Sequence, residues 1–87
     1  MIQVRKIDGT TFHVTVTARV KTDHTVTVDP SYHEKLTAGQ VSVEALVEKS
    51  FEFLLEREPN TSILKEFDLP TINHYFPEYE GAIRKML

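Results

Sequence analysis

The chain has 87 residues, with ten Lys and Arg against thirteen Asp and Glu, and it contains no cysteine. This length allows one small domain, and the lack of cysteine excludes disulfides, zinc sites built on thiolates and thiol catalysis. The negative net charge of the chain argues against electrostatic binding to nucleic acid or to an acidic membrane.

Residues 1–29 carry the pattern of a sheet. Apolar and polar side chains alternate over residues 12–20, and β-branched Val and Thr fill most of these positions. A period of two is typical of a strand with one buried face. Shorter runs at residues 2–4 and 26–28 predict one strand before the long strand and one after it.

Three-residue turns at residues 7–9 and 21–23 keep the apolar side chains of neighbouring strands on one face. The expected cross-strand pairs are Ile2 with Val14, Val4 with Phe12, Ala18 with Val26, and Val16 with Val28. The result is a three-stranded antiparallel meander. Its second face is polar and carries Gln3, Arg5, His13, Thr15, Thr17, Arg19, Thr25 and Thr27.

Residues 30–87 carry helical patterns. Ser31 and Glu34 form a capping-box pattern for a turn or two at residues 32–36. Ser42 is a suitable N-cap for a helix from Val43 to about Glu58. The apolar stripe of this helix has helical spacing and consists of Val43, Leu46, Val47, Phe51 and Leu54, widened by Phe53 and Leu55.

Shorter helical pieces are expected at residues 62–67, 69–76 and 77–87. Their apolar side chains are Ile63, Leu64, Phe67, Leu69, Ile72, Phe76, Ile83 and Met86. We therefore predict a single α+β domain, residues 1–87, in which a helical layer at residues 30–87 covers one face of the meander. The core joins Val14, Val16, Val26 and Val28 to Leu46, Phe51 and Leu54.

No motif for catalysis or metal binding stands out. The four histidines lack metal-ligand spacing, and the carboxylates of residues 44–56 lie on one solvated helix face. There is no glycine-rich phosphate loop and no Gly-x-Ser-x-Gly elbow. We expect a protein that is not an enzyme, with no metal and no cofactor. No apolar run exceeds three residues, which is too short to span a membrane.

Residues 62–76 read as two short helices around a tight connection, followed by Tyr75-Phe76-Pro77. This segment resembles the helix-turn-helix of tetracycline-repressor-type regulators, which implies DNA binding through Thr71, Asn73 and His74. Residues 60–87 carry three Lys and Arg against four Asp and Glu. A DNA-reading surface normally brings several positive charges to the phosphates. Packing of Tyr75, Phe76 and Tyr79 under the long helix is therefore the favoured interpretation, and an exposed aromatic docking patch is a further alternative.

The second half also resembles a group of small, uncharacterised bacterial proteins. The resemblance is carried by FEFLLEREP at residues 51–59, SIL at 62–64, FDL at 67–69 and YFPEYE at 75–80. It implies a bacterial cytosolic protein without assigning an activity. The short start of the chain, Met1-Ile-Gln-Val-Arg-Lys, lacks the apolar stretch of a secretory signal, which agrees with a cytoplasmic location.

These observations favour a non-catalytic protein–protein interaction or regulatory module with an unknown protein partner. The alternative is a DNA-binding regulator using a degenerate helix-turn-helix at residues 62–76. The candidate interaction surface consists of Arg5, His13, Thr15, Thr17, Arg19, Thr71, Asn73, His74, Tyr75 and Tyr79.

The open edge of the third strand, from His24 to Asp29, carries no charge to block pairing until Asp29. Open edges tend to pair with another chain. We expect this edge to be covered by the C-terminal helix or to pair across a two-fold axis in a homodimer.

Overall fold

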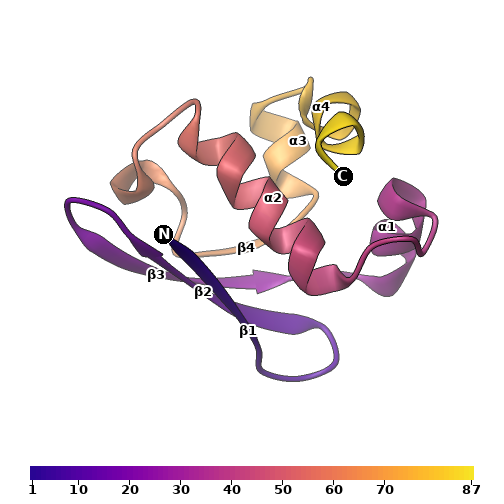
Figure 1. The fold of residues 1–87 in the computed structure, drawn as a ribbon, viewed down its shortest axis with the longest axis horizontal. Coiled ribbons are helices and arrows are strands. Elements are labelled where there is room, and N and C mark those ends of the chain that lie inside the picture. Colours follow the sequence, from indigo (N-terminus) through magenta and orange to yellow (C-terminus); the bar gives the residue numbers. More distant parts are fainter.

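A four-stranded sheet forms one layer of the molecule, and helices form the other (Figure 1). The computed structural model describes all of residues 1–87. No helix in it is both long and apolar enough to cross a membrane. The elements, in chain order, are β1 (Ile2–Lys6), β2 (Thr11–Thr17), β3 (Lys21–Thr27), α1 (Pro30–Thr37), α2 (Val43–Leu55), a 3-10 turn (Asn60–Ser62), β4 (Glu66–Asp68), α3 (Thr71–Tyr75) and α4 (Tyr79–Met86).

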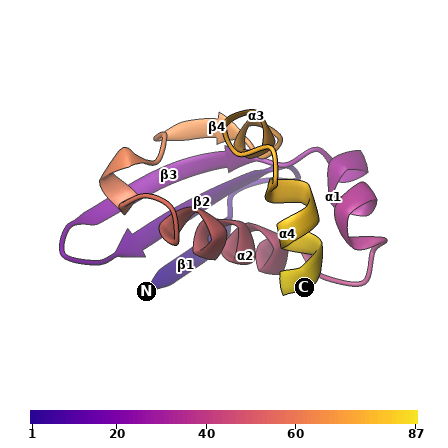
Figure 2. The ribbon, with the colours of Figure 1, turned by 90° about the horizontal axis from the view of Figure 1, so that it is seen from above.

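The helix α2 lies along the sheet, while α1, α3 and α4 are grouped toward one end of it (Figure 2). The β2–β3 turn projects at the opposite end. This arrangement confirms an α+β fold with a helical layer over a sheet. The sheet itself differs from the predicted one, since it has four strands in the order β1-β2-β3-β4 and its last pair is parallel.

Both antiparallel pairs differ from the predicted register. Val4 lies opposite Val14, and Phe12 lies opposite Val26. The first connection is longer because the Asp8 carboxylate accepts hydrogen bonds from the backbone of Thr10 and Thr11, at 3.0 and 2.9 Å, as short polar side chains do in turns. Both shifts are by an even number of residues, so the predicted apolar face is kept.

The second turn falls at residues 18–20 instead of 21–23. Ala18 and Val20 therefore leave the apolar face, and Val20 is 51% exposed. His24 takes a place in the core opposite Val14. Its ring is 2% exposed and lies 5.3 Å from the ring of Phe51, measured between centroids.

A helical piece was predicted at residues 62–67. The strand β4 forms at the end of this segment instead. It runs parallel to β3, and the flanking backbone adds hydrogen bonds from Thr25 N to Lys65 O and from Leu69 N to Thr27 O, at 2.7 and 2.9 Å. Two expectations are thereby corrected. The edge of β3 is completed within the chain, neither by the C-terminal helix nor by a second copy, and residues 62–76 contain one short helix in place of a helix-turn-helix.

The helix boundaries follow their caps. Asp29, not Ser31, caps α1, because its Oδ1 accepts from the Ser31 backbone N at 2.8 Å. The predicted cap of α2 is confirmed, since Ser42 Oγ accepts from Ala45 N at 3.1 Å. This helix ends at Leu55, three residues before the predicted end.

The core lies between the sheet and α2, as predicted. It is completed by side chains from β4, α3 and α4. The buried apolar residues are Phe12, Val14, Val16, Val26, Val28, Leu36, Leu46, Val47, Phe51, Phe53, Leu54, Ile63, Phe67, Leu69, Ile72, Tyr79 and Ile83.

Phe51→Ala tests the importance of this core. Phe51 is fully buried, and its ring also lies 6.1 Å from the ring of Phe67 on β4. We expect the free energy of unfolding to fall by about 3–5 kcal/mol, a large part of the stability of a small domain. Urea denaturation followed by circular dichroism measures the change. Glu48→Ala, an exposed position on the same helix, is the control and should stay within about 0.5 kcal/mol. Equal midpoints for Phe51→Ala and the parent would contradict the predicted packing.

Candidate functional site

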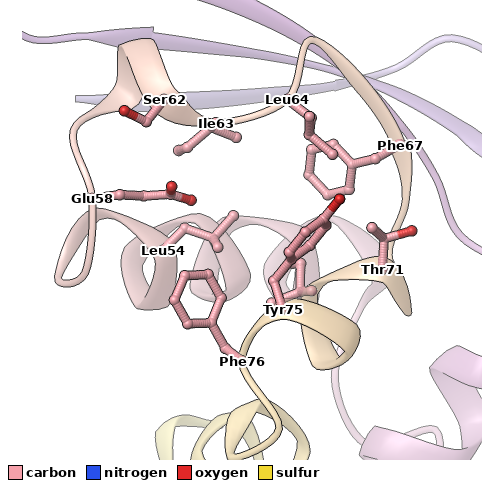
Figure 3. Close-up of a pocket in the computed structure, with 10 residues that line it drawn as sticks. Leu54, Glu58, Ser62, Ile63, Leu64, Phe67, Thr71, Tyr75 and Phe76 are labelled. Carbon is pink, nitrogen blue, oxygen red and sulfur yellow. The ribbon is translucent and has the colours of Figure 1, made fainter.

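An apolar pocket of about 220 Å³ opens between the end of α2, the segment before β4, β4 itself and α3 (Figure 3). Seven of the ten lining residues are hydrophobic. The lining consists of Leu54, Glu58, Ser62, Ile63, Leu64, Phe67, Thr71, Ile72, Tyr75 and Phe76.

The pocket has a buried floor and an exposed apolar rim. Leu54, Ile63 and Ile72 are buried and belong to the core. Leu64 and Tyr75 are 47% and 62% exposed, although both line the same cavity. The Tyr75 side chain projects from α3 with its hydroxyl toward the side where Leu64 lies (Figure 3). Exposed apolar side chains beside a concave apolar floor are typical of a surface that receives another molecule.

The carboxylate of Glu58 reaches into this pocket from the segment after α2 (Figure 3). The residue is partly buried, and this burial raises the pKa of the Glu58 carboxyl above its ordinary value. The neighbouring Arg57 gives it no counter-charge, because the Arg57 guanidinium binds Glu78 Oε2 at 3.2 Å and stacks 3.5 Å from the ring centre of Phe53. Glu58 is therefore an unpaired acid in apolar surroundings.

A buried polar network holds one wall of the pocket to the sheet. The His24 ring bonds through Nδ1 to the Leu64 carbonyl oxygen and through Nε2 to Thr22 Oγ1, at 2.8 and 2.9 Å. Asn60 Nδ2 donates to Val20 O and to Thr22 Oγ1, both at 2.8 Å. These bonds fix residues 60–64 against β3, so the shape of the pocket depends on side chains that do not line it.

A second, polar hollow lies on the other side of the same segment. It is lined by Lys21, Thr22, Asp23, His24, Asn60, Thr61, Ile63 and Lys65. The polar side chains of Thr22, His24 and Asn60 already bond to one another or to backbone. The free groups of this hollow are therefore the exposed side chains of Lys21, Thr61 and Lys65, which form no ion pair and no side-chain hydrogen bond.

Two of the predicted interaction residues, Thr71 and Tyr75, line the pocket. His74 is exposed beside Tyr75, with 5.3 Å between ring centres. Asn73 Oδ1 accepts from the Glu80 backbone N at 3.3 Å and so joins α3 to α4. Tyr79 does not belong to an interaction surface. It is fully buried, with its hydroxyl 2.6 Å from Ser50 Oγ, and is therefore a packing residue.

The other predicted residues lie on the face of the sheet that the helices leave uncovered. They are Arg5, His13, Thr15 and Thr17, with Arg19 in the β2–β3 turn. Asp23 contacts two of these residues, because its Oδ1 lies 3.3 Å from His13 Nε2 and accepts a hydrogen bond from Thr15 Oγ1 at 2.9 Å. The predicted surface is thus divided between two faces. No three His, Asp or Glu side chains come together in a way that could hold a metal ion.

Glu58 and Leu64 are site residues that the sequence pattern does not indicate. Glu58 was expected to be the end of a helix, and Leu64 was expected to be buried. The available signal was Pro59, which ends helical structure and allows the chain to turn back beside Leu54. No protein-family model, curated protein or solved structure matches the chain.

Asn60→Ala tests the polar network. The variant removes the hydrogen bonds that Asn60 Nδ2 donates to Val20 O and to Thr22 Oγ1, and each lost hydrogen bond costs about 0.5–1.5 kcal/mol of unfolding free energy. Urea denaturation measures this cost, and hydrogen exchange should become faster at the amides of Ile63 and Thr25, which donate to Asn60 O and Lys65 O. Thr61→Ala, at the exposed neighbouring position, is the control. Unchanged exchange at both amides would contradict the role assigned to Asn60.

Glu58→Gln tests the unpaired acid. Burial raises the pKa of Glu58 in the folded state, so the folded protein holds this proton more tightly than the unfolded chain does. This contribution to stability is present at low pH and is lost as the pH rises through the raised pKa. We expect the variant to melt at a higher temperature than the parent at pH 7.

The gain should vanish near pH 4, around the ordinary pKa of glutamate at about 4.3. Differential scanning calorimetry across this pH range measures it. Glu48→Gln on the exposed face of α2 is the matched control. A gain that is independent of pH, or one that the control reproduces, would contradict the assignment.

Proposed function

We propose that this protein is a non-catalytic interaction module that binds a partner protein through the apolar pocket. The observation that carries the proposal is the exposure of Leu64 and Tyr75 beside a buried apolar floor. A tyrosine at the rim of a desolvated pocket is a frequent centre of binding energy in protein interfaces. We also propose a bacterial cytoplasmic setting for this role, an expectation that comes from the sequence resemblance of residues 51–80 alone.

The size of the pocket favours a side chain of a larger partner over a free metabolite. Sites for small molecules usually enclose about 300–1,000 Å³, whereas this pocket has about 220 Å³. A single apolar side chain that protrudes from a protein surface suits such a volume. The surrounding rim then supplies the remaining contact area.

The polar groups of the pocket support binding more than catalysis. Its hydroxyls belong to Ser62, Thr71 and Tyr75, and the one ionisable acid is Glu58. General acid–base or nucleophilic catalysis needs a nucleophile and a base within hydrogen-bond reach of each other. None of these four side chains forms a hydrogen bond with another. The DNA-binding alternative has lost its geometric support, because residues 62–76 do not form two helices.

The test compares capture of proteins from the native host's lysate by the parent and by variants of the rim. Leu64→Ser and Tyr75→Ser should each reduce retention of a specific protein by at least tenfold, since interface anchors are often worth 2 kcal/mol or more. Quantitative mass spectrometry measures the retained amounts. Ile7→Ser, which changes an exposed apolar residue far along the chain in the β1–β2 turn, is the matched control.

Retention that is equal for the parent and the rim variants would contradict the proposed function. Loss of binding in the Ile7→Ser control would show that general surface hydrophobicity, and not the pocket, is responsible.

A further inference from the structure

Glu58 is the one charged residue among those that line the pocket. It forms no ion pair and no side-chain hydrogen bond, while other acids around it are paired, as Glu56 and Glu78 are with Arg57. A charged carboxylate in apolar surroundings without a partner lowers the stability of the fold. A bound cation would remove this cost, because it would supply the missing counter-charge.

The cation nearest to Glu58 in sequence is already engaged. The Arg57 guanidinium donates to Phe53 O, in the last turn of α2, at 3.0 Å and to Glu78. That last turn contains no basic residue of its own. Glu58 therefore supplies the free negative charge at this side of the apolar pocket.

We propose that the pocket recognises a partner segment in which a large apolar side chain is followed or preceded by lysine or arginine. The apolar side chain enters between Leu54, Ile63 and Ile72, and the cation binds Glu58. The stem of the lysine or arginine packs along the exposed rim at Tyr75, as long basic side chains do on apolar surfaces. This inference rests on the proposed function and specifies the chemistry of the partner.

A second copy of the chain fits this chemistry less well. Val20 is exposed between Arg19 and Lys21, but the short side chain of valine would leave much of the pocket empty, which is unfavourable. Ile7 is exposed beside Lys6, but Asp8 follows it directly and would bring a like charge toward Glu58. Leu64 precedes Lys65, but its side chain already lines the pocket of its own chain, and Met86, which follows Lys85, packs against the core. The occupant assigned here is therefore a segment of another protein.

The probes are four blocked hexapeptides of the form Gly-Ser-X-Z-Gly-Ser, in which X-Z is Leu-Lys, Leu-norleucine, Leu-Glu or Ala-Lys. Norleucine keeps the stem of lysine and removes its charge. Titrations of the intact protein are followed by the backbone amide signals of Ile63, Leu64 and Thr71. The Leu-Lys peptide should bind about two- to fivefold more tightly than Leu-norleucine, a range that a partly exposed ion pair can supply. It should also bind more tightly than Leu-Glu and Ala-Lys.

Variants of Glu58 give the decisive comparison. Glu58→Gln should abolish the preference for Leu-Lys over Leu-norleucine, and Glu58→Lys should shift the preference to Leu-Glu. Glu56→Gln changes the net charge equally at a residue outside the pocket, and it should keep the preference of the parent. Thermal melting of each variant shows that the comparison is made on folded protein.

Three results would overturn the inference: equal binding of Leu-Lys and Leu-Glu, an unchanged preference in Glu58→Gln, or no shift of the pocket amides with any peptide at millimolar concentration. Capture of a partner that depends on Leu64 and Tyr75 but not on Glu58 would overturn the charge assignment and leave the proposed function standing. A dimer in sedimentation velocity that is lost in Glu58→Gln would also overturn it, by assigning the pocket to a second copy.

Discussion

The parallel pairing of β4 with β3 determines where the whole second half of the chain lies. Parallel neighbours need a long crossover, and here α1 and α2 provide it before the chain returns to the sheet at Glu66. The pairing places Phe67 against Phe51 and starts α3 close to the end of α2. Without these three residues in the sheet, neither the floor nor the rim of the pocket would be in place.

The faces of the sheet could be predicted from the sequence, but the register could not. Alternation has a period of two, so any even shift buries the same side chains. The choice among such shifts was made by local polar groups: the Asp8 carboxylate closes the first turn, and His24 gains two hydrogen bonds only when it faces the core. The strand β4 is three residues long, which is too short for periodicity to distinguish it from a turn.

The site could be predicted in part. Thr71 and Tyr75 were predicted because they lie in the segment that resembles a helix-turn-helix, although this segment contains a single short helix in the structure. Glu58 was not, since its importance depends on a chain reversal at Pro59 and on the direction of the Arg57 side chain, and both are tertiary properties. An unpaired acid in apolar surroundings lowers the stability of the fold. Binding sites commonly contain such residues, because a surface that is shaped for a ligand is less stable than one that is shaped only for folding.

The late position of β4 in the chain has a consequence for biosynthesis. During synthesis, β3 emerges from the ribosome roughly forty residues before its parallel neighbour. For that interval the sheet exposes a nearly uncharged edge, the kind of template on which nascent chains stick to one another. The same edge reappears whenever residues 60–68 detach from the folded protein, because local opening of a short peripheral strand needs less energy than global unfolding. A partner bound in the neighbouring pocket, as proposed above, would stabilise the closed position of residues 60–68 and so reduce the fraction of molecules with an open edge.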